Sequence, residues 1–162
     1  MSDTTVLYVS RDGHSRALAE ELGKKLGVEA LEIVDLVKRK GLIGWIRSGR
    51  QASSGAATPI REPKVDLSSV KTVVLVQPVW ASAVCPPIRS YLREHAKVLA
   101  GKRVAVLASA YGTPSAVIRA KFEGEFGAEI GRLAACAVVL QKDDEAGRRR
   151  TVETFVAELA GT

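Results

Sequence analysis

The sequence predicts an α/β protein built on a doubly wound, five-stranded parallel sheet with helices on both faces. Apolar runs of strand length alternate along the chain with segments of helical periodicity, which is the pattern of such folds. Two runs, at residues 72–77 and 103–108, are almost continuously apolar and rich in valine, as in parallel strands covered on both faces. With 162 residues, 46% of them hydrophobic, we expect one domain over residues 1–162.

The first strand and helix follow each other directly. Val6 to Val9 is a short apolar run, and a helix is predicted soon after it because Leu18, Leu22 and Leu26 recur every four residues. Charged residues fall on the other side of this helix and form i, i+4 pairs of opposite sign, each stabilising by roughly 0.2 to 0.5 kcal/mol. The pattern predicts a helix with one buried face.

The remaining elements are predicted in the same way. Residues 29–34 form a more polar strand that suits a sheet edge, and residues 134–140 form the fifth strand. Helices are expected after both central strands, at about 86–96 and 114–126, each beginning near a proline. Asp143 and Asp144 are candidate caps of a final helix. Its apolar stripe comprises Val152, Phe155, Val156 and Leu159.

Residues 38–58 stand outside this order. The segment begins with three basic residues, continues with an apolar cluster of Leu42, Ile43, Trp45 and Ile46, and ends in a run of serine, glycine and alanine. We interpret it as a short helix followed by a mobile loop. Either Trp45 covers the sheet as part of an ordinary crossover helix, or the cluster is a lid or subunit contact beside a ligand site.

Composition excludes several classes of function. The net charge of +6 favours anionic ligands, yet the basic residues are scattered without a stacking face for nucleic acid. No apolar run is long enough to span a membrane, and the N-terminus lacks the features of a signal peptide, so a cytoplasmic location is predicted. Cys85 and Cys136 form no CxxC motif, and with only two histidines no metal cluster is expected. The two thiols are predicted to be buried.

Three loops follow strands that end at the same edge of the predicted sheet. They read SRDGHS at 10–15, QPVWASAVCPP at 77–87 and SAYGTP at 109–114. Ligands of open α/β sheets bind beyond the carboxyl ends of the strands, where the strand order reverses. Small and polar residues with one aromatic in each of the last two loops suit a flat, phosphorylated ligand.

These loops resemble those of the flavodoxin-like flavoproteins. The usual phosphate loop of that family reads S/T-x-T-G-x-S/T, which the chain matches everywhere except the third position, and PVWASAVCPPIRSYL is similar to the second loop. The resemblance covers the whole chain and implies strand order 2-1-3-4-5 with FMN as cofactor. Ser10, Ser15 and the backbone N–H groups of the loop would hold the phosphate, and the loops of Trp80 and Tyr111 would flank the ring. The implied cofactor-binding residues are Ser10, Arg11, Asp12, Gly13, His14, Ser15, Pro78, Val79, Trp80, Ala81, Ser82, Ser109, Ala110, Tyr111 and Gly112.

Asp12 departs from the family pattern, which has threonine there. An inward carboxylate about 5 Å from the phosphate would cost roughly 3 kcal/mol per unit of phosphate charge at an effective dielectric of about 20. We therefore expect Asp12 to point outward, to accept a nearby backbone N–H, and to be neutralised by Arg11 and Arg16. A similar T-R-D-G-Q-T loop is found in the menaquinone-dependent protoporphyrinogen oxidase branch. The alternative is a capped helix start that binds no ligand.

The resemblance implies an FMN-dependent oxidoreductase that passes electrons between a donor and a small acceptor such as a quinone, with the flavin doing the chemistry. No catalytic side chain is assigned. Relatives with an NAD(P)H reductase activity usually assemble, so analogy suggests NAD(P)H as a candidate donor and a homodimer through the Trp45 cluster, while the sequence itself leaves donor, acceptor and oligomeric state open. Two alternatives stay open. One is a basic flavodoxin-like carrier that docks a redox protein, although electron-carrying flavodoxins are typically acidic, and the other is an interaction domain without FMN.

Overall fold

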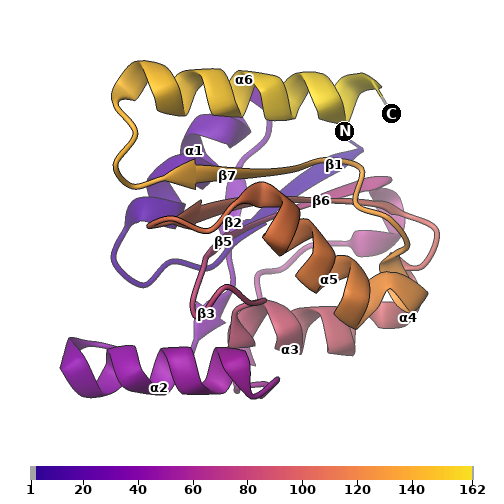
Figure 1. The fold of residues 1–162 in the computed structure, drawn as a ribbon. Coiled ribbons are helices and arrows are strands. Elements are labelled where there is room, and N and C mark those ends of the chain that lie inside the picture. The colour runs from indigo at the N-terminus through magenta and orange to yellow at the C-terminus, as the bar shows by residue number, and fades with distance from the viewer. Residues whose placement is uncertain (1–2, 162) are drawn as a thin grey trace.

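The computed structural model describes residues 3–161 and confirms the predicted fold class (Figure 1). Its main sheet has the order β2-β1-β5-β6-β7, and every neighbouring pair is parallel. This is the 2-1-3-4-5 order expected from the loops. The strands are β1 (Thr4–Tyr8), β2 (Ala30–Glu32), β5 (Thr72–Pro78), β6 (Arg103–Ala110) and β7 (Cys136–Leu140).

Alternate residues of the central strands supply two separate cores. In β5, Val73 and Leu75 belong to the core on one face of the sheet, whereas Val74 and Val76 belong to the core on the other. The register pairs Leu75 with Leu7 of β1 and with Val106 of β6, so side chains at the same height pack side by side. Burial on both faces explains why the central strands are almost entirely apolar.

The helices divide between the two faces as predicted (Figure 1). Leu18 and Phe155 belong to the core beneath α1 (His14–Leu26) and α6 (Glu145–Gly161). Ile88 and Phe122 belong to the core beneath α3 (Pro86–Glu94) and α5 (Ser115–Ile130). No helix within residues 3–161 combines the length and the apolar composition needed to cross a bilayer.

Several element boundaries differ from the prediction. The strand expected at 29–34 divides, because β3 (Val34–Asp35) leaves the main sheet and pairs antiparallel with β4 (Ile60–Arg61). The helix expected at 86–96 breaks at His95, after which α4 (Ala96–Leu99) follows. Asp144 caps α6 as predicted, accepting the Gly147 N–H at 2.7 Å, whereas Asp143 accepts the Leu140 N–H.

The segment at 38–58 forms a longer helix than predicted. Helix α2 (Gly41–Ser53) continues into the serine-rich run and contacts the rest of the protein through Gly44, Ser48 and Ala52. Trp45 is 59% exposed, so the interpretation that it covers the sheet is wrong. The side of α2 that faces the protein carries small side chains, so the bulky apolar side chains of the helix face outward.

Both cysteines are free and buried, as predicted. Burial raises the pKa of the Cys85 thiol to about 12 and that of Cys136 to about 11. The described residues contain no cluster of three or more His, Cys, Asp or Glu side chains placed to hold a metal ion.

Candidate functional site

Three loops at the carboxyl edge of the sheet surround a cleft of about 560 Å³, and α2 forms its outer wall. The loops are those that follow β1, β5 and β6. Eleven of the fifteen predicted site residues line this cleft: Arg11, Asp12, Pro78, Val79, Trp80, Ala81, Ser82, Ser109, Ala110, Tyr111 and Gly112. The topology thus brings together loops that lie up to 100 residues apart in sequence.

The other four predicted residues lie around the loop after β1. Ser10 lines a second hollow of about 470 Å³, which Arg11 and Trp80 also line. Gly13 and His14 line a third, of about 320 Å³. Ser15 lies below the loop, in the first turn of α1, and is 1% exposed.

The loop after β1 satisfies its own polar groups in this structure. The Gly13 N–H donates to Ser10 Oγ at 3.0 Å, and the His14 N–H donates to Asp12 Oδ1 at 3.3 Å. Gly13 has φ 96°, a left-handed conformation that favours glycine. Two N–H groups at the start of α1 therefore already have acceptors. These are groups that would otherwise donate hydrogen bonds to a bound anion.

Asp12 behaves largely as expected. It is exposed, accepts a backbone N–H within its own turn, and forms a 3.9 Å ion pair with Arg11. The expectation that Arg16 also neutralises it is wrong, because the Arg16 guanidinium pairs with Glu32 at 2.9 Å and stacks near the Tyr8 ring. The pairing with Glu32 raises the pKa of Arg16.

Ser15 Oγ is buried and, within the described part of the chain, has no hydrogen-bond partner. Leaving a buried hydroxyl unpaired costs roughly 1 to 3 kcal/mol, so such atoms are rare and call for an explanation. At the positive end of the α1 dipole, a bound anionic group beside the hydroxyl would supply one.

The loop after β5 is held in a strained conformation. Ala81 and Ser82 have φ of 51° and 52°, which L-residues adopt rarely. Gln77 is fully buried and braces the loop: its Oε1 accepts the Cys85 N–H at 2.9 Å, and its Nε2 donates to the Ala83 carbonyl. Strain of this kind is typical of binding sites, where the surrounding structure imposes a backbone shape.

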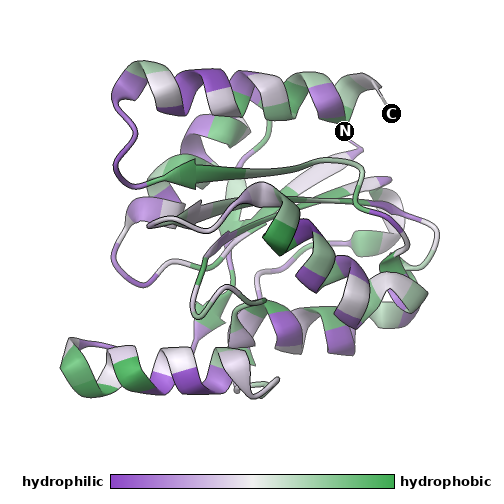
Figure 2. Cartoon of the chain, in the orientation of Figure 1, coloured by the Kyte–Doolittle hydropathy of each residue, from purple (hydrophilic) through white to green (hydrophobic). Residues whose placement is uncertain are grey.

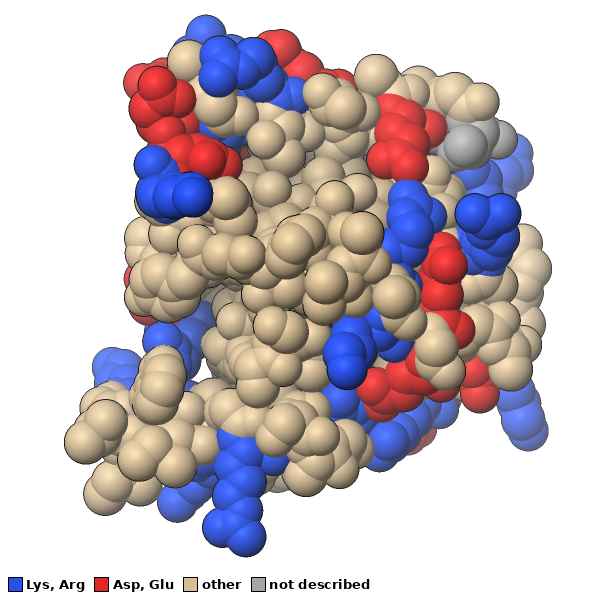
Figure 3. Space-filling model, viewed as in Figure 1, with Lys and Arg blue, Asp and Glu red and all other residues tan. Residues whose placement is uncertain are grey.

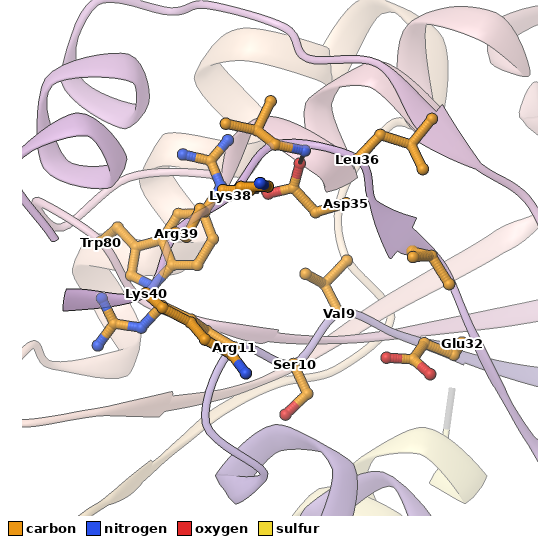
Figure 4. Close-up of a pocket in the computed structure, with 12 residues that line it drawn as sticks. Val9, Ser10, Arg11, Glu32, Asp35, Leu36, Lys38, Arg39, Lys40 and Trp80 are labelled. Carbon is orange, nitrogen blue, oxygen red and sulfur yellow. Dashed lines mark hydrogen bonds and ion pairs between the residues drawn. The ribbon is translucent and has the colours of Figure 1, made fainter. Parts of the chain in front are cut away.

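Trp80 forms the partition between the cleft and the second hollow. It is 8% exposed, and the Arg39 guanidinium lies 4.9 Å from the centre of its ring (Figure 4). Arg39 is itself held by an ion pair with Asp35 and by a 2.7 Å bond to Gln51 Oε1. The indole position is therefore set by a buried cation that the sequence analysis did not select. A single arginine in a basic run carries no signal of this role.

The loop after β6 completes the cleft. Ser82 and Thr113 hydroxyls are 3.1 Å apart, which ties this loop to the preceding one. Tyr111 is exposed at the mouth of the cleft. Sequence reasoning did not select several other residues that line the cleft. For those in α2, the available signal was the hypothesis of a lid at 38–58. The residues are Trp45, Ile46, Ser48, Gly49, Arg50, Thr113 and Gln141.

The chain is similar to solved structures in its fold, but not to known families in its sequence. No protein-family model matches the chain, and no curated protein matches its sequence. Among solved structures, oxidised flavodoxin 1 from Bacillus cereus is similar with a TM-score of 0.54 and 12% identity, over 98% of this chain and 97% of that one. The fold is flavodoxin-like. At 12% identity, the similarity to this flavodoxin shows the fold and does not identify a cofactor.

Two further solved structures are more similar in shape. A candidate flavoprotein from Bacteroides eggerthii has a TM-score of 0.74 and 20% identity, over 96% of this chain and 99% of that one. A flavoprotein from Lactobacillus acidophilus, determined in complex with FMN, has a TM-score of 0.66 and 19% identity, over 76% of this chain and 85% of that one.

Proposed function

We propose that the protein is an FMN-binding redox protein and that the cleft beyond β1, β5 and β6 holds the flavin. The observation that carries the proposal is the convergence of three loops of complementary chemistry at one edge of the sheet. One loop leads into the N-terminus of α1, where the buried Ser15 hydroxyl has no partner among residues 3–161, and the other two present a braced Trp80 and an exposed Tyr111. A similar fold, that of the Lactobacillus acidophilus protein, is known with FMN bound.

The residues present fit the cofactor. Ser15 Oγ and the N–H groups of Gly13 and His14 would hold the phosphate, with Ser10 and Asp12 releasing those N–H groups as it binds. The isoalloxazine would lie in the larger cleft beside Trp80, whose position is set by Arg39. When bound, FMN supplies one- and two-electron chemistry, and the chain supplies orientation and electrostatics.

We further propose that the protein acts as an oxidoreductase toward a small acceptor such as a quinone, with NAD(P)H as the donor. The exposed mouth at Tyr111 and the apolar wall of Trp45 and Ile46 support entry of a small apolar molecule. A net charge of +6 disfavours the acidic docking surface of electron-carrying flavodoxins. An anaerobic stopped-flow comparison decides between the classes. FMN-loaded, reduced protein should react faster with a soluble quinone than with an acidic iron–sulfur protein, and the reverse order would support a carrier.

The direct test of the cofactor is titration. FMN added to the apoprotein should be bound with quenching of flavin fluorescence, whereas riboflavin, which lacks the phosphate, should bind far more weakly. Ser15→Ala should weaken FMN about tenfold to a hundredfold and leave riboflavin unchanged, because it removes one hydrogen bond to a charged group. Ser69→Ala, which removes an exposed hydroxyl elsewhere, is the matched control. Equal affinity for FMN and riboflavin would exclude a phosphate site in this loop.

Asp12→Thr should tighten FMN by about threefold to tenfold, because a repulsive charge leaves the loop, and in the apoprotein the threonine hydroxyl can still accept the His14 N–H. The melting temperature of the apoprotein should hardly change. If threonine instead weakens FMN and lowers the melting temperature, the Asp12 carboxylate is a structural cap of α1 and the outward, tolerated charge is refuted.

A further inference from the structure

The net positive charge of the protein resides in one segment, although its basic residues are spread along the chain. The chain has 24 Lys and Arg against 18 Asp and Glu, and residues 36–61 contain six of the former and none of the latter. The rest of the chain therefore carries 18 of each sign, and the net charge of +6 resides in these 26 residues. Lys38, Lys40, Arg47 and Arg50 are exposed around α2, whereas Arg39 is buried against Asp35.

The same segment carries a cluster of exposed, bulky apolar side chains. These form what we call the α2 ridge: Leu42 (73% exposed), Ile43 (75%), Trp45 (59%) and Ile46 (54%). At 3.6 residues per turn they fall within about 160° of the helix circumference, and the middle of this sector lies opposite the buried Gly44. The ridge occupies the projecting end of α2, green in Figure 2 and flanked by Lys and Arg in Figure 3.

The helix that carries the ridge is held at its C-terminal end. Arg89, 2% exposed, donates to the carbonyls of Ala52 and Ala56 at 3.1 and 2.8 Å and pairs with Glu125. Arg39 reaches Gln51 from the other side. The apolar side chains are therefore exposed in the folded protein itself, and their exposure requires a partner or a function.

We propose that the α2 ridge docks the protein on the surface of an anionic lipid bilayer. A short helix with a contiguous apolar face that includes tryptophan, bordered by Lys and Arg, has the chemistry of helices that lie in the membrane interface. Anionic headgroups would meet the exposed cations while the ridge enters the acyl boundary. Every exposed charged residue of the segment at 36–61 is a cation, which fits an anionic surface.

A second copy of the chain fits less well. In a symmetric dimer the ridge would meet itself and bring the four exposed cations of each copy together. The carboxylates nearest in sequence are already paired, Asp35 with Arg39 and Glu62 with His95, and so are unavailable to compensate. An anionic bilayer, unlike a second copy, offers negative headgroups to the cations and an acyl layer to the apolar side chains.

Docking would place one wall of the cleft at the membrane. Trp45, Ile46 and Arg50 belong both to α2 and to the cleft lining, so an apolar electron acceptor dissolved in the bilayer would reach the site directly. This last consequence rests on the proposed redox function. The docking itself does not, since it depends only on the ridge and on the cations at residues 36–61.

Vesicle sedimentation tests the proposal with the full chain, with and without FMN. Binding to phosphatidylcholine vesicles containing about a third phosphatidylglycerol should exceed binding to pure phosphatidylcholine at least tenfold and fall in salt. Leu42→Ser with Ile43→Ser should reduce the partition coefficient about tenfold or more, whereas Val117→Ser, on the exposed part of α5, should not. In a Trp80→Phe background, where Trp45 is the sole tryptophan, emission should shift to the blue on anionic vesicles.

Charge is tested by matched triple variants. Lys38→Gln, Lys40→Gln and Arg47→Gln together should weaken vesicle binding by about fivefold per charge. Lys24→Gln, Lys97→Gln and Lys121→Gln remove the same charge from other exposed positions and should change binding little. Equal effects of the two triples, or equal binding to both vesicle types, would overturn the proposal. So would binding to soluble polyglutamate that survives the ridge substitutions, or a dimer in sedimentation velocity that those substitutions dissociate. Vesicle binding without FMN affinity would instead leave docking intact and refute the redox function.

Discussion

The two halves of α2 are attached to the protein in opposite ways. The last turn and the residues after it are held by polar contacts, because the buried Arg89 donates to the carbonyls of Ala52 and Ala56. The first two turns meet the protein mainly through Gly44, while their large side chains face outward. The C-terminal half is fixed by a buried arginine, and the N-terminal half exposes apolar side chains to solvent.

This difference shows that an apolar side chain in an amphipathic helix need not mark the buried face. The contact side of α2 is a stripe of small residues, which lets the helix backbone approach Arg39 closely. The anchoring energy comes from a cation on another helix, so α2 is free to present its bulky residues elsewhere. Substitutions at Arg89, Gly44 and Ile43, the first two with a matched control, test this contrast.

The largest effect is expected at the anchored half. Arg89→Met should lower the free energy of unfolding by about 2 to 4 kcal/mol, because it leaves the carbonyls of Ala52 and Ala56 without their donor and removes one of the two arginines that pair with Glu125. Urea denaturation would measure this. Arg93→Met, which removes a half-exposed arginine of the same helix that also approaches Glu125, should cost less than about 1 kcal/mol. Equal losses would show that the buried arginine is not the anchor.

A smaller effect is expected at the closest approach of the helix. A Cβ on Gly44 would lie 2.1 to 2.6 Å from backbone atoms of Arg39, so Gly44→Ala should destabilise by about 1 to 3 kcal/mol. Gly49 lies in the same helix, and a Cβ there meets no atom within 4 Å. Gly49→Ala should therefore stabilise by roughly 0.5 to 1 kcal/mol. Thermal melts of the pair provide the comparison, and destabilisation by both would mean that α2 tolerates no added side chain on either face.

The smallest effect is expected at the exposed half. Ile43→Ser should change the free energy of unfolding by no more than about 0.5 kcal/mol, because the side chain is already in water in the folded state. Chemical denaturation in the absence of lipid measures this. A loss above about 2 kcal/mol would place the ridge in a core and contradict its role as a free surface.

Sequence reasoning reached the fold through local signals. The near-continuous apolar strands at 72–77 and 103–108 require cover on both faces, and the alternation with helices then requires a parallel sheet. Strand ends also predicted which loops meet, and eleven of fifteen predicted residues line one cleft. Boundaries such as the split at Val34 were missed, because departure from the main sheet depends on pairing with Ile60 and Arg61 far along the chain.

What the sequence determined by itself is therefore the order of strands, helices and loops, since periodicity, turn residues and caps act between near neighbours. Tertiary structure alone decided where Arg39 and Arg89 point and which face of α2 is buried. Arg39 stacks on Trp80 from 41 residues away, and Arg89 caps carbonyls more than 30 residues earlier. Such contacts follow from how helices pack on the finished sheet. A lone arginine has the same local appearance whether it is solvated or buried as the anchor of another helix.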